Sequence, residues 1–222
     1  MPMVSGLSTF ECTVIAPGGV RLPASVDLPD PAVAIAILAH GAGSSRDSPR
    51  GRAVAGTLHR FGIGSMRVDL LTAEESRDRG LVFDIGLLSE RLDAAVGFAA
   101  GDERTRGIPI ALVGASTGAA AALTVAARRP TAIVAVVSRG GRADLAGSDL
   151  GRVRAPTLLL VGSDDPVVLG LNREAFARLG GEKELVSIPG ATHLFEEPGT
   201  LEEVSRRTAR WIVAHARPGA GR

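Results

Sequence analysis

The sequence has 222 residues, of which 45% are hydrophobic and 22% charged, and its formal net charge is +1 at pH 7. These values exclude a disordered or fibrous protein, so we expect a single domain over residues 1–222. Because arginines and acidic residues are interleaved along the chain, neither nucleic acid nor a membrane surface is an expected partner. Flexible ends are expected at about residues 1–8 and 217–222.

The location of the protein is predicted from three absences. The longest apolar run, residues 32–39, is too short to cross a bilayer. The first residues lack the basic and apolar regions of a secretory signal. Cys12 is the only cysteine and cannot form an intramolecular disulfide. A cytoplasmic protein is therefore expected.

Short apolar runs alternate with longer segments of helical periodicity, which is typical of βαβ units and a mostly parallel sheet. At the start of the chain, Pro17-Gly18-Gly19 separates two extended stretches and suits the turn of an antiparallel hairpin. We therefore predict an α/β fold with about eight strands and helices on both faces. The strands are expected at residues 11–15, 20–28, 33–39, 64–69, 109–113, 132–137, 157–161 and 184–188.

The helical segments carry start and stop signals. Pro49 favours the start of a helix, and an Ala-rich helix is expected over residues 117–129. Asn172 is expected to cap a later helix. Thr200 and Glu203 have the spacing of a capping box at the start of the last one.

The segment Gly114-Ala115-Ser116-Thr117-Gly118 lies where an apolar strand ends and the Ala-rich helix begins. Small residues around a serine permit the strained strand-to-helix turn, called a nucleophile elbow, that exposes its hydroxyl. The helix directs the Thr117 N–H and its dipole at the site, where they can stabilise an oxyanion. On its own, however, this short pattern fits a glycine-rich turn equally well.

Two later loops offer the base and the acid that a serine nucleophile needs. Asp164 and Asp165 follow one apolar strand, and His193 follows the next. The order Ser, Asp, His is the one expected of a serine hydrolase on such a sheet. The alternative is that the aspartates are turn or cap residues and that His193 is an ordinary loop histidine. The coincidence of three loops favours a triad built on Ser116.

The stretch His40-Gly41-Ala42-Gly43-Ser44-Ser45-Arg46 follows a buried strand. It is similar to the H-G-x-G loop that supplies a second oxyanion-hole N–H, here that of Ala42. The alternative is a phosphate-cradling loop, but the G-x-x-x-x-G-K-[ST] and G-x-G-x-x-G spacings are absent. No pair of His or Cys residues has metal-ligand spacing, so we expect no metal and no cofactor.

The stretches HGAGSSRDSPR, FDIGLLSERL, GASTGAAAAL, VSRGGRADLAG and PGATHLFEEPG resemble the α/β-hydrolase superfamily, in particular its dienelactone-hydrolase-like branch of small bacterial serine hydrolases. The resemblance implies the α/β-hydrolase fold over nearly the whole chain. It also implies hydrolysis of a carboxylic ester or lactone through an acyl-serine intermediate. The G-x-x-D pattern of that branch, starting at Gly162, selects Asp165 as the acid that orients His193.

Two departures qualify the substrate that the resemblance implies. Members that open dienelactones use a cysteine nucleophile, whereas this chain has Ser116 at that position. The segment over residues 138–154 is too short for a large lid. Aromatic residues are scarce, so a small or polar ester or lactone is the expected small-molecule substrate.

Three polar residues on the predicted catalytic edge are candidates for binding the substrate: Arg139, Ser44 and Arg46. Arg139 directly follows an apolar strand, and its planar fork suits a carboxylate or phosphate. A structural salt bridge within its loop is the alternative. The same triad would also serve an acyltransferase or a thioesterase, and a non-catalytic binding protein of this fold is a further alternative.

Overall fold

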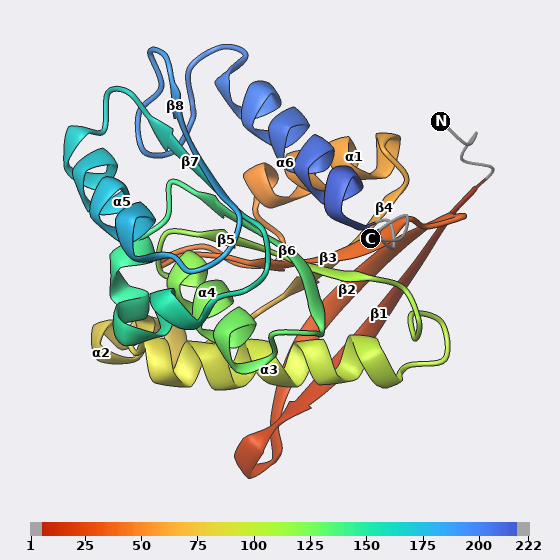
Figure 1. Ribbon diagram of the computed structural model, residues 1–222. Helices are drawn as coiled ribbons and strands as arrows, with labels where there is room; N and C mark the ends of the chain where they lie inside the picture. The colour runs from red at the N-terminus through yellow and green to blue at the C-terminus, as the bar shows by residue number, and fades with distance from the viewer. Residues whose placement is uncertain (1–5, 217–222) are drawn as a thin grey trace.

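Eight strands form one sheet in the computed structural model, which describes residues 6–216. Their order across the sheet is β1-β2-β4-β3-β5-β6-β7-β8 (Figure 1). The β1–β2 and β2–β4 pairs are antiparallel, and the other neighbours are parallel. The predicted α/β fold is therefore confirmed. The strands are β1 (Gly6–Ala16), β2 (Val20–Asp30), β3 (Ala34–Ala39), β4 (Ile63–Val68), β5 (Ile110–Ala115), β6 (Ile133–Arg139), β7 (Thr157–Gly162) and β8 (Lys183–Ile188).

The predicted hairpin is present and is longer than expected. Its turn is the short 3₁₀ segment η1 (Pro17–Gly19), and its tip reaches past the neighbouring helices (Figure 1). Residues 6–8, which we expected in a flexible end, instead pair with residues 28–30 of β2. Backbone pairing needs no apolar side chains, which explains why the apolar pattern missed this part of the strand. Residues 1–5 and 217–222 lie outside the described residues.

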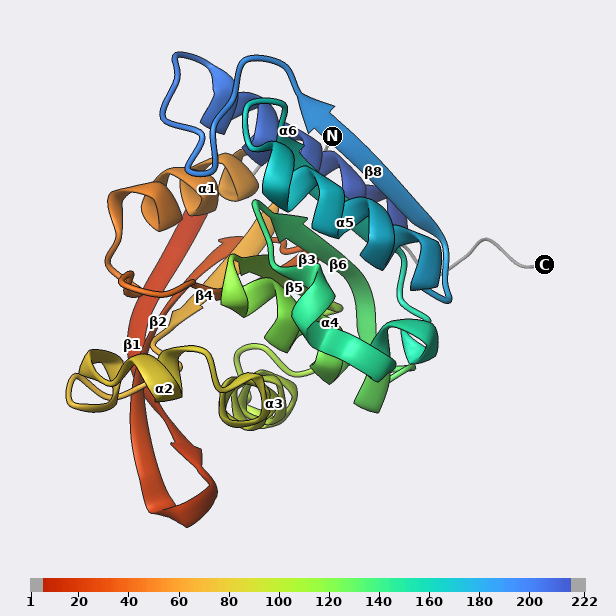
Figure 2. The ribbon, with the colours of Figure 1, turned by 90° about the vertical axis from the view of Figure 1, so that its left-hand side faces the viewer.

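Helices cover both faces of the sheet (Figures 1 and 2). Leu112 of β5 packs in the cluster on the α3, α4 and α5 side, whereas the next residue, Val113, packs in the cluster on the α1 and α6 side. This alternation is the one that a strand buried on both faces requires. Within residues 6–216, no helix has the length and apolar character needed to span a membrane. The helices are α1 (Pro49–Arg60), α2 (Arg79–Val82), α3 (Ile85–Gly101), α4 (Thr117–Arg128), α5 (Pro166–Arg178) and α6 (Thr200–Ala216), with 3₁₀ segments η2 (Glu75–Arg77) and η3 (Ala143–Arg152).

The start of α5 differs from the prediction. The helix begins at Pro166, and the Asp165 side chain accepts a hydrogen bond from the Val168 N–H at 3.3 Å. Asn172 is not a cap: it is buried inside the helix and donates to the Gly141 carbonyl at 2.8 Å. Proline lacks an N–H and fits the first turn, so Asp165-Pro166 is the stronger start signal.

The predicted capping box at the start of α6 is also absent. Thr200 donates its hydroxyl proton to the Glu197 carbonyl at 2.7 Å. The Glu203 carboxylate binds Arg206 and Arg207 one turn along the helix. Glu203 is thus drawn to arginines on its own helix face, where i,i+3 and i,i+4 partners lie within reach.

The parallel strands end at one edge of the sheet, and the predicted site residues gather there. His40 follows β3, Ser116 follows β5, Arg139 ends β6, Asp165 follows β7 and His193 follows β8. This edge is where ligands bind in open α/β sheets.

Two glycines allow α4 to approach the sheet at this edge. A Cβ on Gly118 would lie 2.3 Å from the Ala39 carbonyl oxygen, and one on Gly114 would lie 2.4 Å from the Ala119 Cα. Both distances are far shorter than real contacts, and the atoms met are backbone atoms. The first turn of α4 therefore packs against the end of β3 only because these positions carry no side chain.

We expect Gly118→Ala to lower the free energy of unfolding by about 1–3 kcal/mol, the usual range for overpacking a core. Gly97→Ala is the matched control, because Gly97 is an exposed residue of α3 and a Cβ there meets nothing within 4 Å. It should raise the free energy of unfolding by up to about 1 kcal/mol through helix propensity. Urea unfolding followed by circular dichroism measures both, and equal stabilities would contradict the close contact.

Candidate active site

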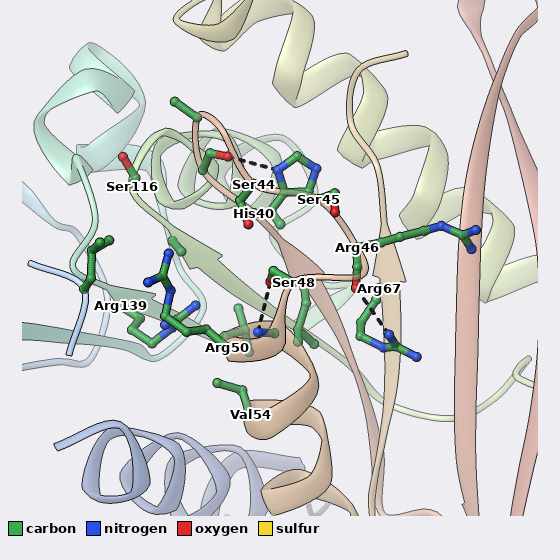
Figure 3. Close-up of a pocket in the computed structure, with 18 of the residues that line it drawn as sticks. His40, Ser44, Ser45, Arg46, Ser48, Arg50, Val54, Arg67, Ser116 and Arg139 are labelled. Atoms are coloured by element: carbon green, nitrogen blue, oxygen red, sulfur yellow. Dashed lines mark hydrogen bonds between the residues drawn. The ribbon is translucent and has the colours of Figure 1, made fainter. Parts of the chain in front are cut away.

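Ser116 occupies a strained turn between β5 and α4. Its backbone has φ 49° and ψ −123°, a positive φ that a serine rarely adopts. The turn is held by the Ser116 carbonyl, which accepts hydrogen bonds from the N–H groups of Ala119 at 3.1 Å and Arg142 at 3.0 Å. The hydroxyl of Ser116 lies on the wall of a cavity of about 310 Å³ (Figure 3).

Asp165 and His193 are hydrogen-bonded to each other. Asp165 Oδ2 lies 2.8 Å from His193 Nδ1, while Asp165 Oδ1 accepts the α5 cap hydrogen bond from Val168. In the neutral imidazole, this contact places the proton on Nδ1 and leaves a lone pair on Nε2. The neighbouring Asp164 instead accepts from the Ser163 hydroxyl at 2.8 Å. Of the two aspartates, Asp165 is thus the one that orients His193.

Close backbone packing fixes the His193 loop beside the cavity. A Cβ on Gly140, which has φ 53°, would lie 2.8 Å from the His193 carbonyl oxygen. A Cβ on Gly162 would lie 2.1 Å from the Ala191 carbonyl oxygen. His193 and Ser116 line the same cavity, although no hydrogen bond joins them in the part of the chain described. In α/β enzymes such contacts often tighten only when substrate is bound.

Two backbone N–H groups beside Ser116 donate no hydrogen bond to another described residue: those of Ala42 and Thr117. Thr117 is the first residue of α4, so its N–H lies at the positive end of the helix dipole. Ala42 belongs to the loop after β3, which contacts the serine directly, since a Cβ on Gly41 would lie 2.6 Å from the Ser116 Cβ. Both predicted oxyanion-hole residues therefore flank Ser116.

The loop that carries Ala42 is tied to the end of β4 by Asp69. Asp69 Oδ1 accepts from the Arg46 N–H at 2.8 Å and lies 3.4 Å from His40 Nε2. The Ser44 N–H donates to the Gly41 carbonyl at 3.3 Å, which closes a turn around Ala42. Asp69 thus restrains both ends of the predicted oxyanion loop.

Arg46 lines the cavity, but its guanidinium points away from Ser116 (Figure 3). It binds Glu11 of β1, the Ser25 hydroxyl at 2.8 Å and, through Nε, Asp69 at 3.4 Å. Arg67 behaves in the same way and pairs with Asp27 at 3.1 Å. Both charges are balanced by carboxylates, so Arg46 holds the loop against the hairpin rather than presenting a free charge to the cavity.

The side chain of Arg139 makes no hydrogen bond or ion pair with another residue in the described part of the chain, and its Nε is fully enclosed. Burial, together with the nearby charge of Arg50, lowers the pKa of Arg139 to about 10. The side chain is therefore still charged at neutral pH. The alternative of a salt bridge within its own loop does not hold, because Asp144 of that loop pairs with Arg142 at 2.8 Å. Within residues 6–216, no group of three or more His, Cys, Asp or Glu side chains is placed to hold a metal ion.

This chain is similar to the solved structure of a dienelactone hydrolase from Anabaena variabilis, with 45% identity and a TM-score of 0.92. The match covers 95% of this chain and 99% of the Anabaena protein. The chain belongs to the α/β-hydrolase superfamily, in its dienelactone-hydrolase-like branch. Est1E from Butyrivibrio proteoclasticus shares the fold at 17% identity and a TM-score of 0.75, covering 95% of this chain and 99% of its own. The structure of XC6422 from Xanthomonas campestris, described as a serine hydrolase without a lid, also shares the fold, at 23% identity and a TM-score of 0.74. The match covers 92% of this chain and 93% of XC6422.

Two curated proteins of Mycobacterium tuberculosis, strains CDC 1551 / Oshkosh and H37Rv, are 49% identical over 205 residues. Each bears the provisional name of a phosphoribosyl transferase. The match covers 92% of this α/β hydrolase but only 46% of each relative, so the chain spans about half of their length. No family model matches the chain.

Arg50 is one of the residues lining the cavity of this α/β hydrolase that sequence reasoning missed, and Arg67 is another. Arg50 is the second residue of α1 and lies on the cavity wall with Arg139. The available signal was the start of a helix at Pro49, directly after the glycine-rich loop. A helix that starts there directs its first residues at the same sheet edge as the loop itself.

We expect Arg46→Met to loosen the loop over residues 40–48, because it removes the contacts with Glu11, Ser25 and the Asp69 carboxylate. Hydrogen exchange of the amides in that loop should speed up by about tenfold, the effect of losing one or two charged hydrogen bonds. Arg52→Met is the matched control, since Arg52 is exposed and its side chain pairs, within the described part of the chain, with Asp47 alone. Unchanged exchange in Arg46→Met would show that Arg46 does not hold the loop.

Proposed function

We propose that this chain is a serine hydrolase that cleaves carboxylic esters or lactones through an acyl-Ser116 intermediate. The observation that carries the proposal is the hydrogen bond between Asp165 and His193 at the wall of the cavity that Ser116 also lines. A serine in a strained turn, an oriented imidazole and free N–H groups are the components that acyl transfer requires. The likeness to a dienelactone hydrolase at 45% identity supports the same class.

In the proposed mechanism, Ser116 Oγ attacks the substrate carbonyl while His193 Nε2 takes its proton. The negative charge that develops on the carbonyl oxygen is stabilised by the N–H groups of Thr117 and Ala42. Each such donor typically contributes a factor of about 10²–10³ to the rate. The C–O bond to the leaving group then breaks, and the protonated His193 donates its proton to the departing oxygen. In a lactone, that oxygen stays attached to the acyl group.

Deacylation uses the same groups in a second cycle. A water molecule gives a proton to His193 and attacks the acyl-Ser116 carbonyl, and the proton then returns to Ser116 Oγ as the acid leaves. Asp165 holds the imidazole in the tautomer that can accept a proton at Nε2, and it stabilises the imidazolium that forms. Serine needs this base because its hydroxyl is a weak nucleophile, unlike the cysteine thiolate.

The cavity favours a small substrate that enters without the movement of a large lid. Between β6 and β7, the chain forms only a short connection built on η3, and the cavity volume is about 310 Å³. Acyl transfer to another acceptor and thioester cleavage would use the same residues. The activity that the name of the curated relatives suggests can belong to the more than half of each relative that this chain does not match.

We expect a fluorophosphonate probe to label the wild-type protein at Ser116, and Ser116→Ala to abolish both labelling and turnover of p-nitrophenyl esters. The loss of turnover should be about 10³-fold or more, since the variant lacks the covalent route. Mass spectrometry of the labelled protein identifies the site, and its melting temperature reports whether the variant is folded. An unlabelled Ser116 in active-site titrations, with no ester or lactone cleaved, would favour the non-catalytic binding protein.

Asp165→Asn should reduce kcat by about 10²–10⁴, because an amide can stabilise the wrong imidazole tautomer. Asp164→Asn is the matched control, since Asp164 is adjacent and bonds Ser163 instead of His193. Steady-state kinetics with one short-chain ester measures both variants. A larger loss in Asp164→Asn would assign the orienting role to that residue.

A further inference from the structure

The cavity beside Ser116 has an unusual charge distribution. In the part of the chain described, its lining includes four arginines and no aspartate or glutamate: Arg46, Arg50, Arg67 and Arg139. Arg46 and Arg67 bind carboxylates that lie behind the cavity wall, as described above. The other two arginines form the opposite wall, so any unbalanced positive charge lies there.

Arg139 is the centre of that charged wall. Among the described residues its guanidinium has no hydrogen-bond or ion-pair partner, and its Nε is fully enclosed although the residue as a whole is only half-buried. A cation in a partly desolvated position with no counter-ion is stabilised when an anion binds beside it. The lowered pKa of Arg139 has the same cause. A ligand that carries negative charge would supply the counter-ion that Arg139 lacks beside Ser116.

Arg50 adds a second cation and a helix terminus to the same wall. Figure 3 shows its side chain beside that of Arg139, on the side of the cavity that α1 borders. Among the described residues it has one ion pair, with Glu196 at 2.9 Å, and Glu196 is 63% exposed, which weakens the compensation. The Arg50 N–H donates to no other described residue and lies in the first turn of α1, where the helix dipole is positive.

We propose that Arg139, Arg50 and the first turn of α1 form a subsite for a phosphoryl group, and that the ester or lactone cleaved at Ser116 carries this group. The inference rests on the proposed function and adds the substrate class to it. Two guanidinium forks and a helix N-terminus match a tetrahedral dianion, which accepts several hydrogen bonds in different directions. A single carboxylate would be satisfied by Arg139 alone and would leave the charge of Arg50 unused.

The Ser44 hydroxyl gives the subsite a neutral donor on the side of the oxyanion loop. Ser44 lines the cavity, and its hydroxyl makes no hydrogen bond to another described residue. The subsite and Ser116 share one cavity of about 310 Å³, which leaves room for only a short link between the phosphoryl group and the reacting carbonyl. The anion would therefore position the carbonyl against Ser116 and the N–H of Ala42.

The test measures binding of inorganic phosphate and of acetate to the Ser116→Ala protein by isothermal titration calorimetry, so that hydrolysis plays no part. Phosphate should bind at least about tenfold more tightly than acetate, because it engages both arginines. Adding Arg139→Met or Arg50→Met should weaken phosphate binding by about tenfold or more. Arg128→Met is the matched control, since Arg128 is exposed at the far end of α4 and should leave binding unchanged.

Arg139→Met also removes a half-buried charge that has no partner among the described residues, without a large loss of volume, so its melting temperature without phosphate should not fall. Arg139→Lys keeps the charge but not the fork, and its phosphate affinity should be intermediate. Equal phosphate binding with and without the Arg139 and Arg50 substitutions would overturn the subsite. Acetate binding as tight as that of phosphate would overturn the phosphoryl class. Failure of ester cleavage in the wild type, with phosphate binding intact, would instead refute the proposed function.

Discussion

The active-site edge depends on the direct contact between the turn at Ser116 and the end of β3 with the loop that follows it. Gly41 lies against the serine side chain, and Gly118 lies against the Ala39 carbonyl, so neither position has room for a Cβ. This contact places the free N–H of Ala42 on one side of Ser116 and that of Thr117 on the other. A shift of either segment would separate the two N–H groups that the proposed mechanism requires at one carbonyl oxygen.

Burial of α4 offsets the strain of that turn. A positive φ at a residue such as Ser116 typically costs about 1–3 kcal/mol, and the surrounding structure must impose it. All residues from Thr117 to Ala127 are buried, and α4 packs between the sheet, α3 and η3. Its small side chains let the helix lie close to the sheet, and they provide apolar contact along its whole length. The alanines of α4 therefore stabilise the strained turn at Ser116 as well as the core.

The sequence predicts those parts of the fold that depend on neighbouring residues. Apolar runs gave the central strands β3 to β7, because a strand buried on both faces needs a continuous apolar segment. The glycine-flanked serine and the chain order of the three loops placed Ser116, Asp165 and His193 at one edge. Local rules failed where a competing partner was near, as for Glu203, or where a side chain reached a distant loop, as for Asn172.

The roles of the cavity arginines could not be predicted from the sequence, because these roles depend on partners far away along the chain. Arg46 was expected to contact substrate, yet its partners Glu11 and Ser25 lie 35 and 21 positions away along the chain. Asp47, the neighbour of Arg46 in the chain, pairs with it only at 3.7 Å, and the closer partners lie far away in the sequence. Only the folded arrangement separates the two arginines, because the hairpin packs against Arg46 while no carboxylate of the described residues pairs with Arg139.

This separation of charge also bears on the proposed chemistry. His193 must become an imidazolium while the carbonyl oxygen becomes negative, and Asp165 stabilises that cation from behind. The charge of Arg139, which lines the same cavity, opposes the imidazolium, because like charges repel. An anionic group bound at Arg139 would cancel this repulsion at the moment when the substrate is in place. Substrates that bring such an anion would then gain in the transition state as well as in binding, since the cation forms only there.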